Sequence, residues 1–174
     1  MADVVRGAVI VLAVVAALVT QVTVIGRFAL PGGGPDLLVP VVVTLSFLRG
    51  ARAGAVIGFV VGLAMDVLPP ADHVIGQYAL VMCLIGYFAG RARERAPGAV
   101  LSCAVACAVA APLLSAGLAA LLGDPRAEQA VLVRSWIPLV AYNLVTVPVV
   151  VWVVGRALGT GRSRAVPMRV RGRA

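Results

Sequence analysis

Asp66 is the ionisable residue with the most unusual setting, because it lies within the otherwise apolar segment 54–66. A carboxylate in a membrane-spanning helix is costly to desolvate and needs a partner or access to water. It could form a buried structural pair or a proton site with Arg27 or Tyr78, or it could contact a substrate. The alternative is a solvated carboxylate at the end of a helix. The residue types alone do not distinguish between these roles for Asp66.

Two further groups of polar residues lie inside apolar segments: Thr20, Gln21 and Thr23 near the start of the chain, and Tyr142, Asn143 and Thr146 near its end. Each could form hydrogen bonds between helices, which contribute roughly 0.6–2 kcal/mol in membranes. Ligand binding is the alternative. We expect Gln21, Asn143 and Asp66 to be structural or interfacial polar residues.

No set of side chains with catalytic or metal-binding spacing is present. The single histidine, His73, falls in a loop and is expected to be solvated. Cys83, Cys103 and Cys107 lie in apolar segments with no histidine or acid nearby to complete a metal site. We therefore expect packing cysteines, no cofactor, no metal and no enzyme.

Three glycines, Gly54, Gly58 and Gly62, precede Asp66 at intervals of four residues. At 3.6 residues per turn, this spacing keeps all four residues on nearly one face of a helix. Small residues on one face allow another helix to approach closely in a bilayer. The glycines are therefore a candidate surface for helix packing inside the chain or for contact with a partner.

These residues must be positioned by membrane helices. The chain is 61% hydrophobic and 13% charged over 174 residues, whereas soluble domains are about 45–50% apolar. We predict an all-α integral membrane protein whose single domain covers 1–158, followed by a disordered arginine-rich cytoplasmic tail at 159–174. Its six predicted spans lie at about 8–27, 36–48, 53–68, 74–90, 98–122 and 135–158. The second is short, so it could be re-entrant, and Asp36 is suited to cap its N-terminus.

The distribution of charge predicts the orientation. All 15 basic residues are arginines. With six spans, twelve of them fall on one side: Arg6, Arg49, Arg52, Arg91, Arg93, Arg95, Arg156, Arg162, Arg164, Arg169, Arg171 and Arg173. The positive-inside rule places that side, with both termini, in the cytoplasm. The tail is expected to bind anionic lipid rather than nucleic acid.

The ordered motifs of the chain resemble the MreD family of bacterial rod-shape-determining proteins. The motif Gly54-x3-Gly58-Phe59-x2-Gly62-Leu63-x2-Asp66 carries the resemblance. Flanking it are Pro35-Asp36-Leu37-Leu38, Arg49-Gly50-x3-Gly54, Gly76-x2-Ala79-Leu80 and Gly86-Tyr87-x2-Gly90, with a looser match at Tyr142-Asn143 and Pro148. The resemblance covers about residues 21–155 and excludes the tail.

The resemblance implies a non-enzymatic subunit of the cell-elongation machinery in the bacterial cytoplasmic membrane. Its implied partners are the bitopic protein MreC, the actin-like MreB filament and the RodA–penicillin-binding-protein peptidoglycan synthase. The family is also similar in architecture to the substrate-binding subunits of energy-coupling-factor transporters. Our hypothesis is a scaffold that docks MreC and supports lateral peptidoglycan synthesis; the rival is a vitamin-binding transporter subunit.

Overall fold

Six α-helices make up the part of the chain that the structure, a computed structural model, describes: residues 2–23, 35–68, 76–123 and 136–158. The helices are α1 (Ala2–Thr23), α2 (Leu38–Arg49), α3 (Ala51–Val67), α4 (Gln77–Arg95), α5 (Val100–Leu121) and α7 (Trp136–Ala157). No strand occurs in these ranges. The prediction of an all-α protein is therefore confirmed.

The short helix α2 forms the centre of the bundle. Each residue from Leu38 to Phe47 is buried, and α2 packs against α1, α3, α4, α5 and α7. Its hydroxyl groups donate within the helix, from Thr44 to the carbonyl of Pro40 and from Ser46 to that of Val42, each at 2.7 Å. A helix enclosed on every side has to be apolar all round, and α2 meets this condition.

Helix α3 pairs closely with α4 and forms a hairpin with it. The turn from α2 into α3 is made at Gly50, whose φ of 86° lies in the left-handed region that glycine adopts without strain. Helix α4 continues to Arg95, beyond the predicted end of its span at about residue 90. The extension is supported by Arg93, which donates to the carbonyl of Leu48 at 2.9 Å at the end of α2.

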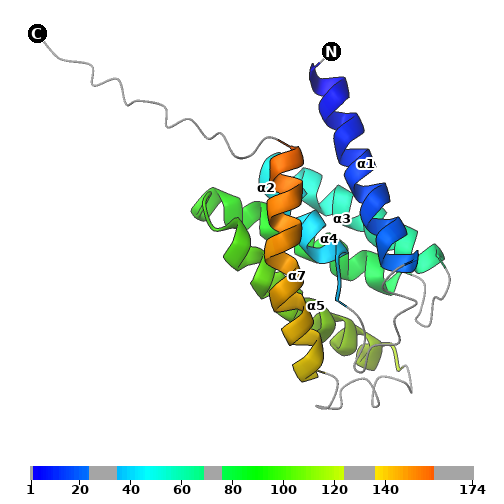
Figure 1. The fold of residues 1–174 in the computed structure, drawn as a ribbon. Coiled ribbons are helices and arrows are strands. Elements are labelled where there is room, and N and C mark those ends of the chain that lie inside the picture. Colours follow the sequence, from blue (N-terminus) through cyan, green and yellow to red (C-terminus); the bar gives the residue numbers. More distant parts are fainter. Residues whose placement is uncertain (1, 24–34, 69–75, 124–135, 159–174) are drawn as a thin grey trace, which may run out of the picture.

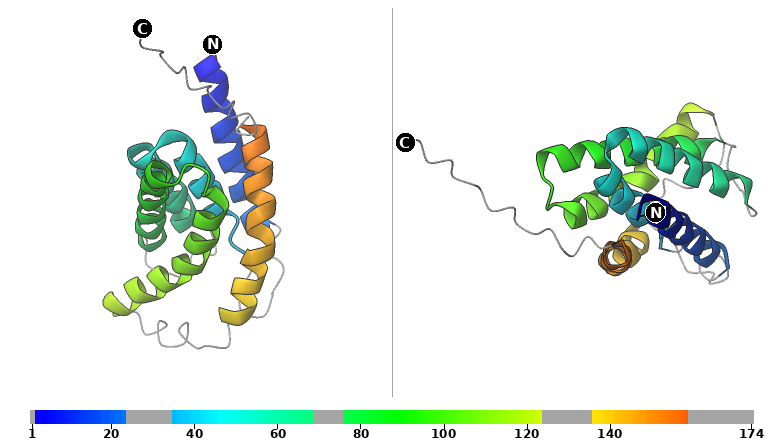
Figure 2. Two further views of the ribbon diagram at one scale, coloured as in Figure 1. Left: turned by 90° about the vertical axis from the view of Figure 1, so that its left-hand side faces the viewer. Right: turned by 90° about the horizontal axis from the view of Figure 1, so that it is seen from above.

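The helices are arranged so that α1 and α7 begin at opposite ends of the bundle. Figure 1 shows the start of α1 and the end of α7 at the same end, with the end of α5 and the start of α7 at the other. Viewed from above in Figure 2, α7 is seen along its axis whereas α3 and α4 are seen from the side. The hairpin is therefore steeply inclined to α7.

Large apolar side chains lie on the outside of the bundle, and several polar side chains are buried within it. Leu12, Val145 and Trp152 are 69%, 72% and 66% exposed. Among the described residues, the buried polar ones are Thr44, Ser46, Asp66, Gln77 and Asn143. Soluble monomers rarely expose contiguous apolar surface on this scale, so the arrangement is that of a membrane protein.

Two segments in the described part of the chain are long and apolar enough to cross a membrane, Val100–Leu121 and Val140–Ala157. The apolar stretches Gly7–Thr23 and Leu38–Arg49 are shorter. Twelve helical residues in α2 span about 18 Å, less than the roughly 30 Å hydrocarbon core of a bilayer. Length and composition alone therefore support two membrane crossings among the described residues.

Candidate functional site

The glycine face of α3 lies directly against α4. A Cβ built on Gly58 would overlap the carbonyl group of Met82, and one on Gly62 would lie 2.5 Å from the Cα of Ala79. A Cβ on Gly54 would meet the backbone oxygen of Gly86 and the side chain of Ser46. The obstacle is mainly backbone, which has no rotamer to change, so only glycine fits at this closeness.

Helix α4 contributes glycines of its own to the same contact. A Cβ on Gly86 would overlap the carbonyl of Gly54, and one on Gly90 would meet the backbone of Ala51. The close approach therefore runs along the hairpin from Ala51 to Gly62. The sequence left open which helix covers Gly54, Gly58 and Gly62, and in the structure that helix is α4 of the same chain.

Asp66 joins the far end of α3 to the beginning of α4. The residue is only 1% exposed. Its carboxylate accepts hydrogen bonds from the backbone N–H groups of Gly76 at 2.9 Å, Ala79 at 3.0 Å and Tyr78 at 3.3 Å. The first N–H groups of a helix have no partner within the helix, and negative charge is favourable there. Asp66 thus caps α4 from the neighbouring helix. It is buried rather than solvated.

A second carboxylate, Asp36, caps α2 at the same end of the hairpin. One oxygen accepts from the backbone N–H groups of Leu38 at 2.8 Å and Val39 at 3.4 Å, as the N-terminal position of Asp36 suggested. Its other oxygen accepts from the phenol of Tyr78. Tyr78 therefore connects the two capped helix ends, with its backbone at Asp66 and its hydroxyl at Asp36.

Gln21 and Asn143 attach the outer helices to the same segment. The side chain of Gln21 accepts from the N–H of Leu37 at 3.0 Å and donates to the carbonyl of Pro35 at 3.3 Å. Asn143 accepts from the N–H of Asp36 at 3.0 Å and donates to the carbonyl of Ala108 at 3.5 Å. Residues from α1, α4 and α7 thus converge on the segment that leads into α2, and Asn143 also bonds to α5.

We call Gln21, Asp36, Asp66, Tyr78 and Asn143 the polar cluster. Sequence reasoning singled out Gln21, Asp66 and Asn143 separately, and only the fold brings them together. It noted Asp36 as a helix cap and Tyr78 as a possible partner of Asp66, but missed the Asp36–Tyr78 contact. A further long-range contact is made by Gln77, whose side chain donates to the carbonyl of Ser115 at 2.9 Å. No local pattern marks such long-range pairs.

The hydroxyl groups near Gln21 and Asn143 act differently from what the sequence suggested. Thr20, Thr23 and Thr146 donate to the carbonyls of Ala16, Val19 and Tyr142, at 2.7, 2.6 and 2.8 Å. Each bond runs four residues back within one helix, so these threonines do not link helices through them. Back-bonding satisfies a hydroxyl locally, whereas the longer amides of Gln21 and Asn143 reach other elements.

Within the described ranges, no three of the His, Cys, Asp and Glu side chains are grouped to hold a metal ion. The polar cluster uses its side chains to cap helix ends and bridge helices. Arg27, the possible partner of Asp66, and His73 lie outside the described residues. The geometry is therefore that of a structural core.

Comparison with known families identifies the chain. Its residues 1–157 match the family of the rod shape-determining protein MreD. The chain belongs to the MreD family. No curated protein and no solved structure matches it. Membership of the MreD family makes this chain a rod-shape-determining membrane protein, associated with the MreBCD complex, and the glycine contact and polar cluster describe how a member of that family is held together.

The hydroxyl of Tyr78 offers a direct test of the polar cluster. Tyr78→Phe removes the bond to Asp36 but keeps the ring, and we expect a loss of about 1–2 kcal/mol in unfolding free energy. Unfolding by sodium dodecyl sulfate, followed by circular dichroism of the purified protein, measures it. Tyr87→Phe is the matched control, because Tyr87 is 41% exposed. Equal stability of the two variants would contradict a bridging role for Tyr78.

Proposed function

We propose that this chain is a non-enzymatic scaffold subunit of the rod complex, with six membrane-crossing segments and both termini in the cytoplasm. It docks an MreC-type bitopic protein and, through the complex, supports an MreB-type filament and the RodA–penicillin-binding-protein synthase in lateral wall synthesis. The observation that carries the proposal is the family match over residues 1–157. The apolar outer surface of the bundle supports the proposal, because exposed apolar helix faces can contact lipid and membrane partners.

The geometry of the polar cluster favours a scaffold over a transporter subunit. A vitamin-binding subunit needs polar groups directed into a pocket. Here the amide and carboxylate groups of Gln21, Asp36, Asp66 and Asn143 are engaged with the protein's own backbone and side chains. The arrangement therefore serves to hold the helices in fixed positions.

The glycine face is proposed to serve the protein's own hairpin, so the surface for MreC lies elsewhere. Gly54, Gly58 and Gly62 all face the backbone of α4, which leaves no room for a partner helix on this face. The arginine-rich tail, 159–174, which lies outside the described residues, is proposed to bind anionic lipid at the cytoplasmic surface.

Co-purification tests the scaffold function. The tagged full chain, expressed in a rod-shaped bacterium and extracted in mild detergent, is expected to retain an MreC-type protein, identified by mass spectrometry. The control is an unrelated tagged membrane protein of similar size from the same host. A stoichiometric vitamin in the eluate, with no MreC-type protein, would overturn the scaffold in favour of a transporter subunit.

A further inference from the structure

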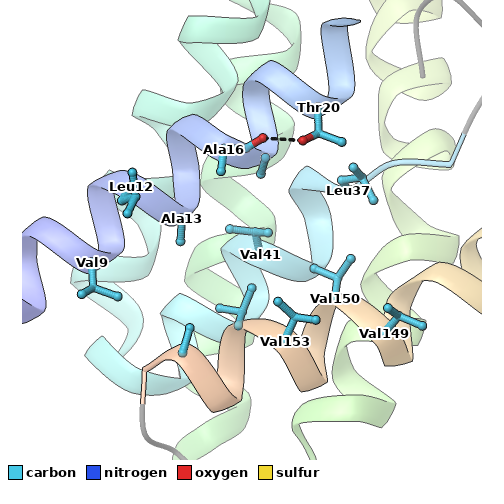
Figure 3. Close-up of a pocket in the computed structure, with 13 residues that line it drawn as sticks. Val9, Leu12, Ala13, Ala16, Thr20, Leu37, Val41, Val149, Val150 and Val153 are labelled. Carbon is cyan, nitrogen blue, oxygen red and sulfur yellow. Dashed lines mark hydrogen bonds between the residues drawn. The ribbon is translucent and has the colours of Figure 1, made fainter. Parts of the chain in front are cut away.

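An apolar groove separates α1 from α7 above the central helix α2. It encloses about 410 Å³. Its lining residues come from three helices and the segment leading into α2: Val9, Leu12, Ala13, Ala16, Ala17, Thr20, Leu37, Val41, Val149, Val150, Val153, Val154 and Ala157. Figure 3 shows side chains of α1 and α7 on opposite walls, with Val41 of α2 between them.

The lining selects for hydrocarbon. Thr20 is its one polar side chain, and its hydroxyl already donates to the carbonyl of Ala16 at 2.7 Å. A polar ligand would lose its hydration without gaining a hydrogen bond from these side chains, which is unfavourable. An apolar chain gains from the burial of its surface.

The length of the groove matches one leaflet of a bilayer. Its α1 wall, from Val9 to Thr20, extends about 16 Å at 1.5 Å per residue. Its α7 wall, from Val149 to Ala157, extends about 12 Å. The hydrocarbon core is about 30 Å thick, so the groove covers roughly half of it. A membrane-spanning partner helix would extend well beyond such a groove, whereas a lipid chain belongs to one leaflet.

Helix α7 carries a cationic residue next in sequence to the last residue that lines the groove. Arg156 precedes the lining residue Ala157, is exposed, and lies over the ring of Trp152 with its guanidinium carbon 5.9 Å from the ring centroid. Helix α7 contains no acidic residue. Guanidinium groups bind phosphate through two hydrogen bonds, and tryptophan is enriched at the level of the headgroups.

We propose that the groove binds one acyl chain of an anionic phospholipid, whose phosphate is held by Arg156. The lipid fills the space between α1 and α7, and it belongs to the leaflet whose headgroups meet the Arg156 end of α7. Helix α1 packs on α2 and α3, and the bound acyl chain would additionally link α1 to α7. This inference does not depend on which protein the scaffold docks.

Native mass spectrometry of the full chain tests the proposal. The purified protein is given phosphatidylglycerol and phosphatidylcholine with identical acyl chains in equal amounts, and we expect one phosphatidylglycerol to be retained. Val153→Trp fills the groove and should remove this adduct, whereas Val145→Trp, at a 72% exposed position of the same helix, should keep it. Arg156→Gln should lower the preference for phosphatidylglycerol about fivefold, the factor of one well-placed arginine.

A second variant fills the groove from the opposite wall and has its own control. Ala13→Phe should also remove the adduct, and Val15→Phe, at a 48% exposed position, should not. Circular dichroism verifies that each variant is folded. Retention of the lipid in both filled variants, or equal retention of the two lipids by the unmodified protein, would overturn the proposal. So would loss of a co-purifying single-span protein from Val153→Trp with the lipid adduct unchanged, because a helix would then occupy the groove.

Discussion

Replacing Gly58 by leucine is expected to lower the unfolding free energy by about 3 kcal/mol or more and to separate α3 from α4. The new side chain would enter the carbonyl of Met82. Overpacked cores usually lose about 1–3 kcal/mol, and here the obstacle is backbone, so the helices themselves must move apart. Unfolding of the purified protein by sodium dodecyl sulfate, followed by circular dichroism, measures the loss.

Two companion variants make the Gly58 result specific. Val60→Leu adds bulk to the same helix at a position that is 58% exposed, and it should leave the unfolding midpoint unchanged. Gly58→Ala adds only a Cβ and should give a smaller loss, roughly 1–3 kcal/mol. If Gly58→Leu and Val60→Leu unfolded at the same midpoint, α4 could not lie against Gly58. Co-purification of the partner should fail together with folding.

Replacing Asp66 by alanine is expected to cost about 3 kcal/mol or more, because three backbone N–H groups lose their acceptor at once. A buried donor left without a partner costs about 1–3 kcal/mol. Asp66→Asn keeps one acceptor oxygen but loses the charge that is favourable at a helix N-terminus. Its unfolding free energy should therefore lie between those of Asp66→Ala and the unmodified protein. Detergent unfolding gives the free energies.

Hydrogen exchange locates the effect of Asp66. The amides of Gly76, Tyr78 and Ala79 should exchange faster in Asp66→Ala, while those in the middle of α5 remain protected. Glu94→Ala is the control, because Glu94 is exposed and pairs with Arg91 at 3.1 Å on the surface, a kind of pair that contributes about 0–1 kcal/mol. Unchanged exchange at the start of α4 would contradict capping by Asp66.

Local sequence patterns anticipated several features of the fold. The four-residue spacing of Gly54, Gly58 and Gly62 places them on one helix face, and the structure has them there. The position of Asp36 before an apolar run predicted a helix cap, which it forms. These features are local, because helix periodicity and capping depend on residues close together in the chain.

The partners across the fold were not predictable in the same way. Nothing near Gly58 in the sequence indicates that Met82 lies against it, and nothing near Asp36 indicates Tyr78. The burial of α2 on all sides was not predictable either. A short apolar segment has the same composition whether it re-enters the membrane or fills the centre of a bundle. Such features depend on how helices far apart in the chain are arranged.

The class of protein, the helical faces and the family can be derived from the amino-acid sequence, because hydropathy, spacing and motif order are properties of the chain alone. The residues that pack against these faces are known only from the three-dimensional fold. It placed α4 against the glycines of α3, buried Asp66 at the start of α4, and gathered Gln21, Asp36, Tyr78 and Asn143 around the entrance to α2. These contacts depend on the fold because a buried polar group must find its partner wherever the packing of the helices provides one.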